Sequence, residues 1–265
     1  MQSIAREMHL SETTFVLPRG KKLEQPSGIR TRIFTVEEEL PFAGHLTLGT
    51  AWVLRGKSDR KEVLLDLNVG QVTVRFSKRE RESFGEMTQP VPKWGTTHRR
   101  DKLAAALGAK ESDLDANLPI ETVSTGNAFA IAAFKSLDLL RGLKPNTSAM
   151  EDYWRGTDAK FLYLVSRETL DPSAGLHARM IFYGGEDPAT GSAAGPAAAW
   201  MLRHGLIGPE DETWIEQGVE ISRPSQIFVQ VGGSREAPVA VRVGGYCCGA
   251  IRGDLSLPAS RAHVH

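Results

Sequence analysis

The sequence predicts an α+β fold built from two similar halves, each a curved sheet around one helix. Two segments, residues 39–52 and 186–200, share an order of features: acid, proline, small residues, glycine, a polar residue, then an apolar run ending near a tryptophan. Each follows a strand-like segment, at residues 30–34 and 178–183. A pattern repeated in this way indicates an internal duplication. The strands that surround each glycine-led helix favour an α+β arrangement.

The first half is expected to alternate strands with short helices. Its elements, in order, are a helix over 2–9, a strand over 12–17, a charged loop over 18–26, a strand over 30–34, a helix over 45–54, a hairpin over 63–76 and a helix over 102–107. The hairpin is indicated by Asn68-Val69-Gly70, a short glycine-containing turn between two apolar runs. The helix over 45–54 is rich in Ala and Gly, so other backbone can pack closely against it.

The second half is expected to follow a charged, turn-rich linker over residues 108–118. Its elements are strands over 120–124, 128–134 and 160–165, a helix over 148–154, the second glycine-led helix, and three or four final strands, with residues 240–251 read as two strands around a glycine turn. We therefore expect one domain over residues 1–108 and another over 119–265, with a C-terminal tail that can return to the first. Neither a G-x-G-x-x-G fingerprint after the first strand nor a phosphate-binding P-loop motif occurs, which argues against a parallel nucleotide-binding sheet.

Composition limits the classes of partner. The 265 residues include 32 basic and 32 acidic side chains, so the net charge is zero and lacks the basic excess of nucleic-acid binders. No apolar stretch is long enough to cross a membrane, and residues 1–8 lack the apolar core of a signal peptide. The two cysteines, Cys247 and Cys248, are adjacent, which rules out a disulfide framework. We expect a cytoplasmic protein that binds a small molecule, not a membrane or a nucleic acid.

The loop that leads into the second glycine-led helix is a candidate anion site. Thr190 and Ser192 are both suitable helix N-caps, and Gly191 between them lets a ligand approach the backbone closely. The first N–H groups of a helix have no partner within it, and the helix dipole is positive at that end. Asp187 places a carboxylate beside this site. The alternative is an ordinary small-residue loop that only starts a helix.

Three side chains are candidates for acid–base chemistry. Glu12 lies where a helix joins a strand, although a glutamate there is more often a structural cap. His45 begins the first glycine-led helix, whose dipole favours a neutral imidazole; a surface capping role is equally compatible with its position. Asp187, near helix N–H groups, is expected to stay ionised and to orient a ligand. Ser192 does not lie in the strand–turn–helix context of a nucleophilic serine.

Several motifs together resemble the PhzF-like family of phenazine-biosynthesis isomerases. The matching segments are residues 5–16, 41–51, 124–127, 186–196, 217–225 and 243–245, and they follow the family order along nearly the whole chain. The resemblance implies the diaminopimelate-epimerase-like fold, in which two similar domains hold the active site between them. It also implies a homodimer.

The resemblance implies roles for the candidate residues. Glu12 would take a proton from the substrate and return it, which requires a pKa raised toward neutrality or a coupled partner. His45 and Asp187 would position the substrate and polarise its amino or hydroxyl groups. The N–H groups at Gly44, Gly191 and Ser192 would hold the substrate carboxylate. The implied reaction is a proton shift on a small, cyclic carboxylate that needs no cofactor and no metal.

Two other functions are compatible with this fold. A non-catalytic protein that binds a small carboxylate, or is regulated by one, would not need Glu12, His45 and Asp187 to meet in one pocket. A racemase that uses two cysteines is disfavoured, because neither glycine-led helix begins near a cysteine. The family usually opens with a strand and a Gly-Asn-Pro segment, whereas this sequence starts on the helix over 2–9. Either its start codon was assigned late, or the first domain lacks its opening strands.

Overall fold

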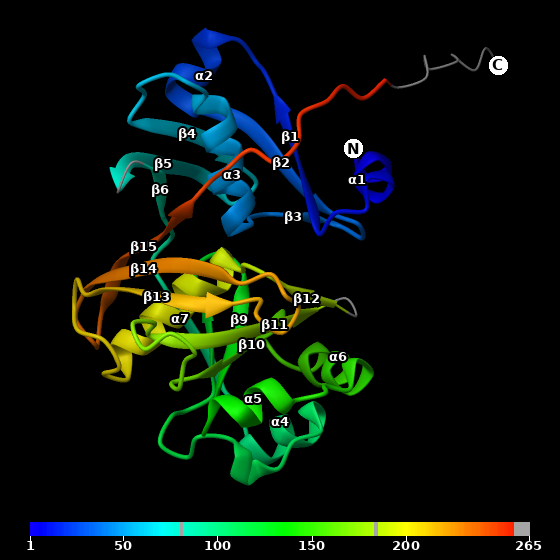
Figure 1. Cartoon of the computed structure of the whole chain (residues 1–265), viewed down its shortest axis with the longest axis vertical. Helices are drawn as coiled ribbons and strands as arrows, with labels where there is room; N and C mark the ends of the chain where they lie inside the picture. Colours follow the sequence, from blue (N-terminus) through cyan, green and yellow to red (C-terminus); the bar gives the residue numbers. More distant parts are fainter. Residues whose placement is uncertain (80–81, 183–184, 257–265) are drawn as a thin grey trace, which may run out of the picture.

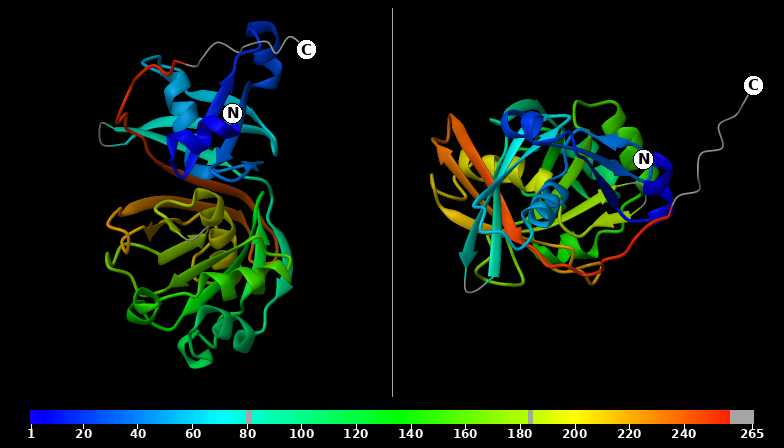
Figure 2. Two further views of the ribbon diagram at one scale, coloured as in Figure 1. Left: turned by 90° about the vertical axis from the view of Figure 1, so that its right-hand side faces the viewer. Right: turned by 90° about the horizontal axis from the view of Figure 1, so that it is seen from above.

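The computed structural model describes residues 1–79, 82–182 and 185–256. The side chains of residues 82, 147 and 182 are not part of this description. Two halves stack along the long axis of the molecule, and each curves around one central helix (Figure 1, Figure 2). The predicted α+β fold with two similar halves is confirmed.

The first half contains nine elements in the described part of the chain. They are α1 (Gln2–Met8), β1 (Glu12–Leu17), α2 (Lys21–Ser27), β2 (Ile29–Thr35), β3 (Glu39–Leu40), α3 (Gly44–Arg55), β4 (Glu62–Leu67), β5 (Gly70–Arg79) and β6 (Glu82–Thr88). Helix α2 occupies a segment predicted to be a charged loop. Its Lys, Leu, Glu and Gln residues are good helix formers, so local propensity outweighs the turn signals of Pro18 and Gly20.

The second half begins with β7, and its last strand returns to the first half. Its elements are β7 (Lys93–Thr97), α4 (Arg100–Leu107), the 3₁₀ turn Glu111–Asp113, β8 (Glu121–Ser124), β9 (Ala128–Phe134), α5 (Leu137–Gly142), α6 (Thr147–Arg155), β10 (Phe161–Ser166), β11 (Leu176–Phe182), β12 (Gly185–Asp187), α7 (Gly191–Arg203), β13 (Glu212–Gln217), β14 (Ser225–Gly233) and β15 (Pro238–Tyr246). Strand β15 is continuous, so the prediction of two strands around a glycine turn over 240–251 is wrong.

One hydrogen-bonded path of strands runs through both halves. Its order is β1-β2-β4-β5-β6-β15-β14-β13-β11-β10-β9-β8-β7. Most neighbours are antiparallel; β2 with β4, β9 with β10, and β11 with β13 are parallel. The halves join where β15 pairs with β6, from Arg242 opposite Thr88 to Tyr246 opposite Phe84. The chain therefore links the halves by strand pairing as well as by a connecting segment.

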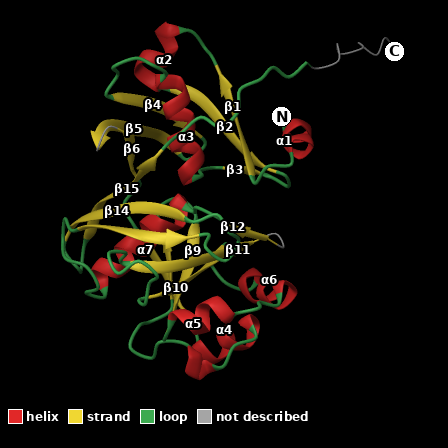
Figure 3. Cartoon of the chain, in the orientation of Figure 1, coloured by secondary structure: helices red, strands yellow, loops and turns green. Residues whose placement is uncertain are grey.

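The segment that holds β7 and α4 packs with the second half. Strand β7 pairs with β8, and Leu103 and Leu107 of α4 lie in the same apolar cluster as Ile120 and Leu162. Figure 3 shows α4 and α5 at the end of the second half farthest from the first, with α6 to one side of them. The boundary over residues 108–118 stays a prediction, and from this packing we propose that the division lies before β7.

Helix α7 is the centre of the main core. Every residue from Gly191 to Leu202 is buried, and Trp200 is fully enclosed. The alanines and glycines of this helix let the sheet close around it, because a Cβ on Gly195 would lie only 1.9 Å from Oε1 of Gln89. Removing the Trp200 ring would cost about 3–5 kcal/mol of stability. Within the described residues, no helix is both long and apolar enough to span a membrane.

Candidate active site between the two halves

The two glycine-led helices, α3 and α7, meet at their N-termini. A Cβ built on Gly44 would lie 2.5 Å from the carbonyl carbon of Gly191 and 2.7 Å from the backbone nitrogen of Ser192. Any side chain at Gly44 would therefore collide with backbone. This close approach brings the positive ends of two helix dipoles to one place.

Two buried amides hold the helix starts together. Asn127 Nδ2 donates to the Phe42 carbonyl, 3.0 Å away and just before α3. Gln89 Nε2 donates to the Gly191 carbonyl at 2.8 Å, and Gln89 Oε1 accepts from Thr125 Oγ1. Asn127 lies in one of the motifs that carry the family resemblance. Gln89 lies in none, and an isolated glutamine at the end of a strand gives no sequence signal.

Glu12, His45 and Asp187 converge on one point, as predicted. Their candidate ligand atoms all lie within 4.8 Å of one another. Glu12 comes from the first residue of β1 and its side chain is only 7% exposed. Its Oε2 lies 3.3 Å from His45 Nε2, and it has no hydrogen-bond partner among the described residues. A carboxylate and an imidazole at this distance can exchange a proton with each other or with a small ligand.

The structure corrects the predicted charge of His45. Burial lowers the pKa of its imidazole, but the contact with Glu12 and the negative charges of Glu12 and Asp187 outweigh burial and raise that pKa to about 9. The prediction of a neutral imidazole considered only the helix dipole. That dipole is equivalent to about half a charge, whereas two carboxylates lie within a few ångströms. His45 is therefore an imidazolium at neutral pH.

The pKa of the Asp187 carboxyl also shifts in the direction opposite to the prediction. Its side chain is buried, and burial, with a smaller contribution from the Glu12 charge, raises the pKa of its carboxyl. Thr190 Oγ1 donates to Asp187 Oδ2 at 2.7 Å, and the Ala189 N–H lies 3.3 Å from Oδ1. These contacts and the nearby His45 oppose the effect of burial but do not reverse it. The carboxyl is held in place, and its pKa is raised above the ordinary value, opposite to the direction expected from helix N–H groups alone.

A second group of buried side chains orients the Asp187 loop. Gln217 Nε2 donates to the Asp187 carbonyl at 2.6 Å and to Thr190 Oγ1 at 2.8 Å. Gln217 Oε1 accepts from the Tyr163 hydroxyl at 2.9 Å. Thr190 occupies the N-cap position of α7, but its hydroxyl contacts Asp187 and does not cap the helix. The predicted N-cap position of Thr190 is therefore confirmed without a capping hydrogen bond from its side chain, whereas Ser192, the other predicted N-cap, lies within α7.

Two cavities meet at His45. The smaller, of about 20 Å³, is lined by Glu12, His45, Asp187 and Ser192 among others, and it has room for about one water. The larger, of about 1000 Å³, is bounded on one side by His45 and Gly191. Its remaining walls are mainly apolar and come from both halves: Leu48, Met87, Leu170, Pro172, Trp214, Val219, Ile227, Val243 and Tyr246. A ligand in the larger cavity can therefore contact His45, which also lines the smaller cavity together with Glu12 and Asp187.

The predicted carboxylate site borders both cavities: Gly191 lines the larger one, and Gly44 and Ser192 line the smaller one. The Gly191 N–H already donates to the Ala189 carbonyl at 3.2 Å. In the described part of the chain, no hydrogen bond involves the N–H groups of Gly44, His45 or Ser192. The two helix starts thus offer unpaired donors, and the cationic His45 adds positive charge beside them. Cys247 and Cys248, by contrast, follow β15 and do not line either cavity.

The same three side chains could in principle hold a divalent cation. Two carboxylates and one imidazole form a donor set that several metals accept. An imidazole binds metal only when neutral, and the raised pKa of His45 keeps it protonated at neutral pH. A cation would therefore have to displace a proton from His45, so its binding should strengthen as the pH rises.

Comparison with known proteins identifies the family. The family model described as "Phenazine biosynthesis-like protein" matches residues 1–253. This chain belongs to the PhzF family. A trans-2,3-dihydro-3-hydroxyanthranilate isomerase of Pseudomonas aeruginosa is 37% identical over 251 residues, which are 92% of this chain and 84% of that protein. Its counterpart in Pseudomonas fluorescens is 36% identical, again over 92% and 84% of the two chains. The chain is thus an isomerase of the PhzF type.

Solved structures agree with this assignment. The PhzF-family phenazine biosynthesis protein of Bacillus anthracis superposes with a TM-score of 0.81 at 28% identity, over 92% of this chain and 85% of that one. A probable proline racemase from Agrobacterium radiobacter has a TM-score of 0.66 at 11% identity, over 98% of this chain and 82% of its own. The latter shares the fold. The diaminopimelate-epimerase-like architecture expected of a PhzF-family chain is therefore confirmed.

Proposed function

We propose that this PhzF-family isomerase shifts a proton on a small carboxylate through the carboxyl group of Glu12. The observation that carries the proposal is the convergence of Glu12, His45 and Asp187 within 4.8 Å, beside a cavity large enough for a substrate. A non-catalytic binding protein would not require a nearly buried carboxyl 3.3 Å from a histidine. The convergence therefore favours the enzyme over the binding protein.

In the proposed reaction, Glu12 removes a proton from a substrate carbon and returns it to another. The electron pair of the broken C–H bond moves through the substrate's double bonds and forms the new C–H bond at the second carbon. The reaction is a net isomerisation, so atoms and electrons balance without an oxidant or reductant. The cationic His45 stabilises the negative charge that develops on the substrate when the proton leaves, and the carboxylate of Glu12 that re-forms when the proton is returned.

The other residues would hold the substrate. The N–H groups of Gly44 and Ser192, with some contribution from Gly191, would bind the substrate carboxylate at the two helix starts. Asp187, kept in place by Thr190, would bind an amino or hydroxyl group on the same ring. We infer a cyclic amino or hydroxy acid as the substrate, since relatives at 36–37% identity are named for trans-2,3-dihydro-3-hydroxyanthranilate.

The test follows trans-2,3-dihydro-3-hydroxyanthranilate in D₂O by proton NMR. The wild type is expected to isomerise it, and Glu12→Gln to lose about 10²–10⁴-fold in rate, the usual contribution of a general acid–base. Glu37→Gln, at an exposed glutamate outside the site, is the matched control and should keep the wild-type rate. Full activity of Glu12→Gln would refute the role of Glu12. If the wild type were inactive on a panel of cyclic amino and hydroxy acids, the substrate class would be wrong.

A further inference from the structure

The loop between β10 and β11 forms part of the outer wall of the larger cavity. Leu170, Asp171 and Pro172 from this loop line the cavity, as do His45 and Gly191. Two hydrogen bonds between neutral groups anchor the C-terminal part of the loop to β13. The Gly175 N–H donates to the Trp214 carbonyl at 2.8 Å, and Trp214 Nε1 donates to Ser173 Oγ at 3.3 Å. These contacts fix the return of the loop but not its tip.

One carboxylate holds the tip. Glu216 Oε1 accepts from the Leu170 N–H at 2.5 Å, and Glu216 Oε2 accepts from the Asp171 N–H at 3.2 Å. Glu216 is 5% exposed and itself lines the larger cavity. Hydrogen bonds from backbone N–H groups to a carboxylate are among the stronger ones in proteins. The shape of the outer wall therefore depends on the position of Glu216.

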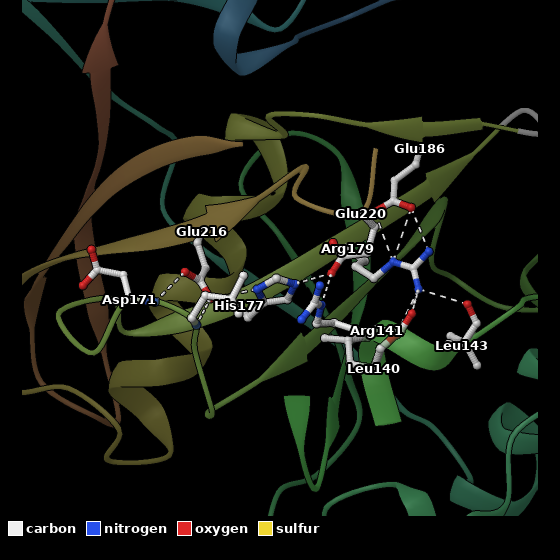
Figure 4. Close-up of polar contacts among 10 residues, drawn as sticks. Leu140, Arg141, Leu143, Asp171, His177, Arg179, Glu186, Glu216 and Glu220 are labelled. Atoms are coloured by element: carbon white, nitrogen blue, oxygen red, sulfur yellow. Dashed lines mark hydrogen bonds and ion pairs between the residues drawn. The ribbon is translucent and has the colours of Figure 1, made fainter. Parts of the chain in front are cut away.

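His177 in turn fixes Glu216. The two residues are register partners on the parallel strands β11 and β13, and His177 Nδ1 lies 2.8 Å from Glu216 Oε1. On its other side, His177 Nε2 lies 3.1 Å from Glu220 Oε1. Figure 4 shows this row from Glu216 through His177 to Glu220, with Arg141 beside Glu220. His177 is completely buried.

The row requires a protonated histidine. A neutral imidazole has one N–H donor, whereas an imidazolium donates from both nitrogens, as two flanking carboxylates demand. Burial lowers the pKa of His177, but Glu220 and Glu216 together raise it above its ordinary value. Other charges face the row: Arg141 lies 3.3 Å from Glu220, and Arg179, two residues along β11, is paired with Glu186 at 2.8 Å. Each carboxylate in or beside the row therefore contacts a positively charged side chain.

The same strand connects the outer wall with the acid–base cluster. Side chains alternate between the two faces of a strand, so Glu216 and Gln217 of β13 point in opposite directions. Glu216 holds the Leu170 loop, while Gln217 orients Asp187 and Thr190. Strand β13 therefore sets the distance between the outer wall and the catalytic cluster.

We propose that Glu216, oriented by His177, is a positioning residue that fixes the loop over 170–172 as the outer wall of the substrate pocket. This inference rests on the proposed function, in which the larger cavity binds the substrate. The pair sets the affinity for the substrate and leaves the proton transfer at Glu12 unchanged. Glu216 has no place in the acid–base cluster itself.

The first test measures amide hydrogen exchange by NMR and does not depend on activity. In the wild type, the Leu170 and Asp171 amides should exchange at least tenfold more slowly than expected for an unstructured chain. Glu216→Gln replaces one acceptor oxygen with an NH₂ group and should speed their exchange about tenfold, the effect of losing one such hydrogen bond. The matched control is Asp211→Asn, since Asp211 Oδ2 accepts from Gly208 N–H at 2.7 Å in a loop away from the cavity. It should leave both amides unchanged.

The second test separates binding from chemistry. Glu216→Gln should raise KM about tenfold with kcat within about twofold of wild type, and Asp211→Asn should change neither. His177→Asn, which keeps one N–H donor toward Glu216, should fall between wild type and His177→Ala in KM. If the histidine variants do not fold, the amide exchange of the wild type and the KM of Glu216→Gln still test whether Glu216 fixes the loop over 170–172.

Fast exchange of the Leu170 and Asp171 amides in the wild type would overturn the inference. An unchanged KM in Glu216→Gln would also overturn it, whether kcat stays the same or falls by the same factor as kcat/KM. A fall in kcat with KM unchanged would make Glu216 a participant in the proton transfer. Failure of the proposed function is distinguishable, because Glu12→Gln would then stay active whatever the exchange of these amides.

Discussion

The contact between Gly44 and Gly191 allows a quantitative test of the site's geometry. In Gly44→Ala, the new Cβ would lie 2.5 Å from the Gly191 carbonyl carbon, where ordinary contacts begin at 3.4 Å. The two helix starts must therefore separate by about 1 Å, because the opposing atoms are backbone and cannot rotate away. Overpacking of this kind costs about 1–3 kcal/mol. A displacement of about 1 Å at a catalytic site can reduce the rate about 10²-fold.

The control for this variant lies in the same helix. Gly49→Ala places a Cβ with nothing within 4 Å, so it should keep wild-type activity. It should also stabilise the protein by about 0.5–1 kcal/mol, the difference in helix propensity between glycine and alanine. Urea denaturation gives the two changes in stability, and steady-state kinetics gives kcat. If Gly44→Ala matched wild type in both, the two helix starts would not be packed as tightly as described.

Four further predictions concern the acid–base cluster. His45 should titrate near pH 9 in an NMR experiment, and Glu12→Gln should lower its pKa; an unchanged titration would contradict the ion pair. Because the folded pKa of His45 is raised, its contribution to stability should be complete below about pH 6.5 and disappear as the pH rises through about 9, seen as a falling denaturation midpoint. Asp187→Asn should lower kcat/KM by about tenfold or more through loss of its contact with the substrate; wild-type kinetics would remove Asp187 from the site. Finally, prolonged treatment with EDTA should leave activity unchanged, whereas inactivation that is restored by a divalent cation would make Glu12, His45 and Asp187 metal ligands.

The positions of the site were predictable because they depend on local backbone requirements. A glycine at the start of each apolar helix signals a close approach, and both Gly44 and Gly191 meet that requirement on the other helix. The strand over Glu12–Leu17 was predicted with its bounds. Helix α2 was missed because its turn-forming residues and its helix formers compete in the same short segment.

The charge states and the supporting residues could not be predicted in the same way. The pKa of His45 depends on Glu12 and Asp187, which are far away in sequence. Gln217 and Glu216 act through contacts with residues 27–46 positions away. Such contacts form only when strands β11 and β13 pair, so no local sequence pattern predicts them.

The central claim is that Glu12 moves the proton while the helix starts and His45 bind the substrate. The most direct measurement compares wild type and Glu12→Gln for both binding and deuterium incorporation into the bound cyclic carboxylate. We expect the variant to show a dissociation constant within about tenfold of wild type and a loss of at least about 10²-fold in deuterium incorporation. Incorporation at the wild-type rate by Glu12→Gln would contradict it.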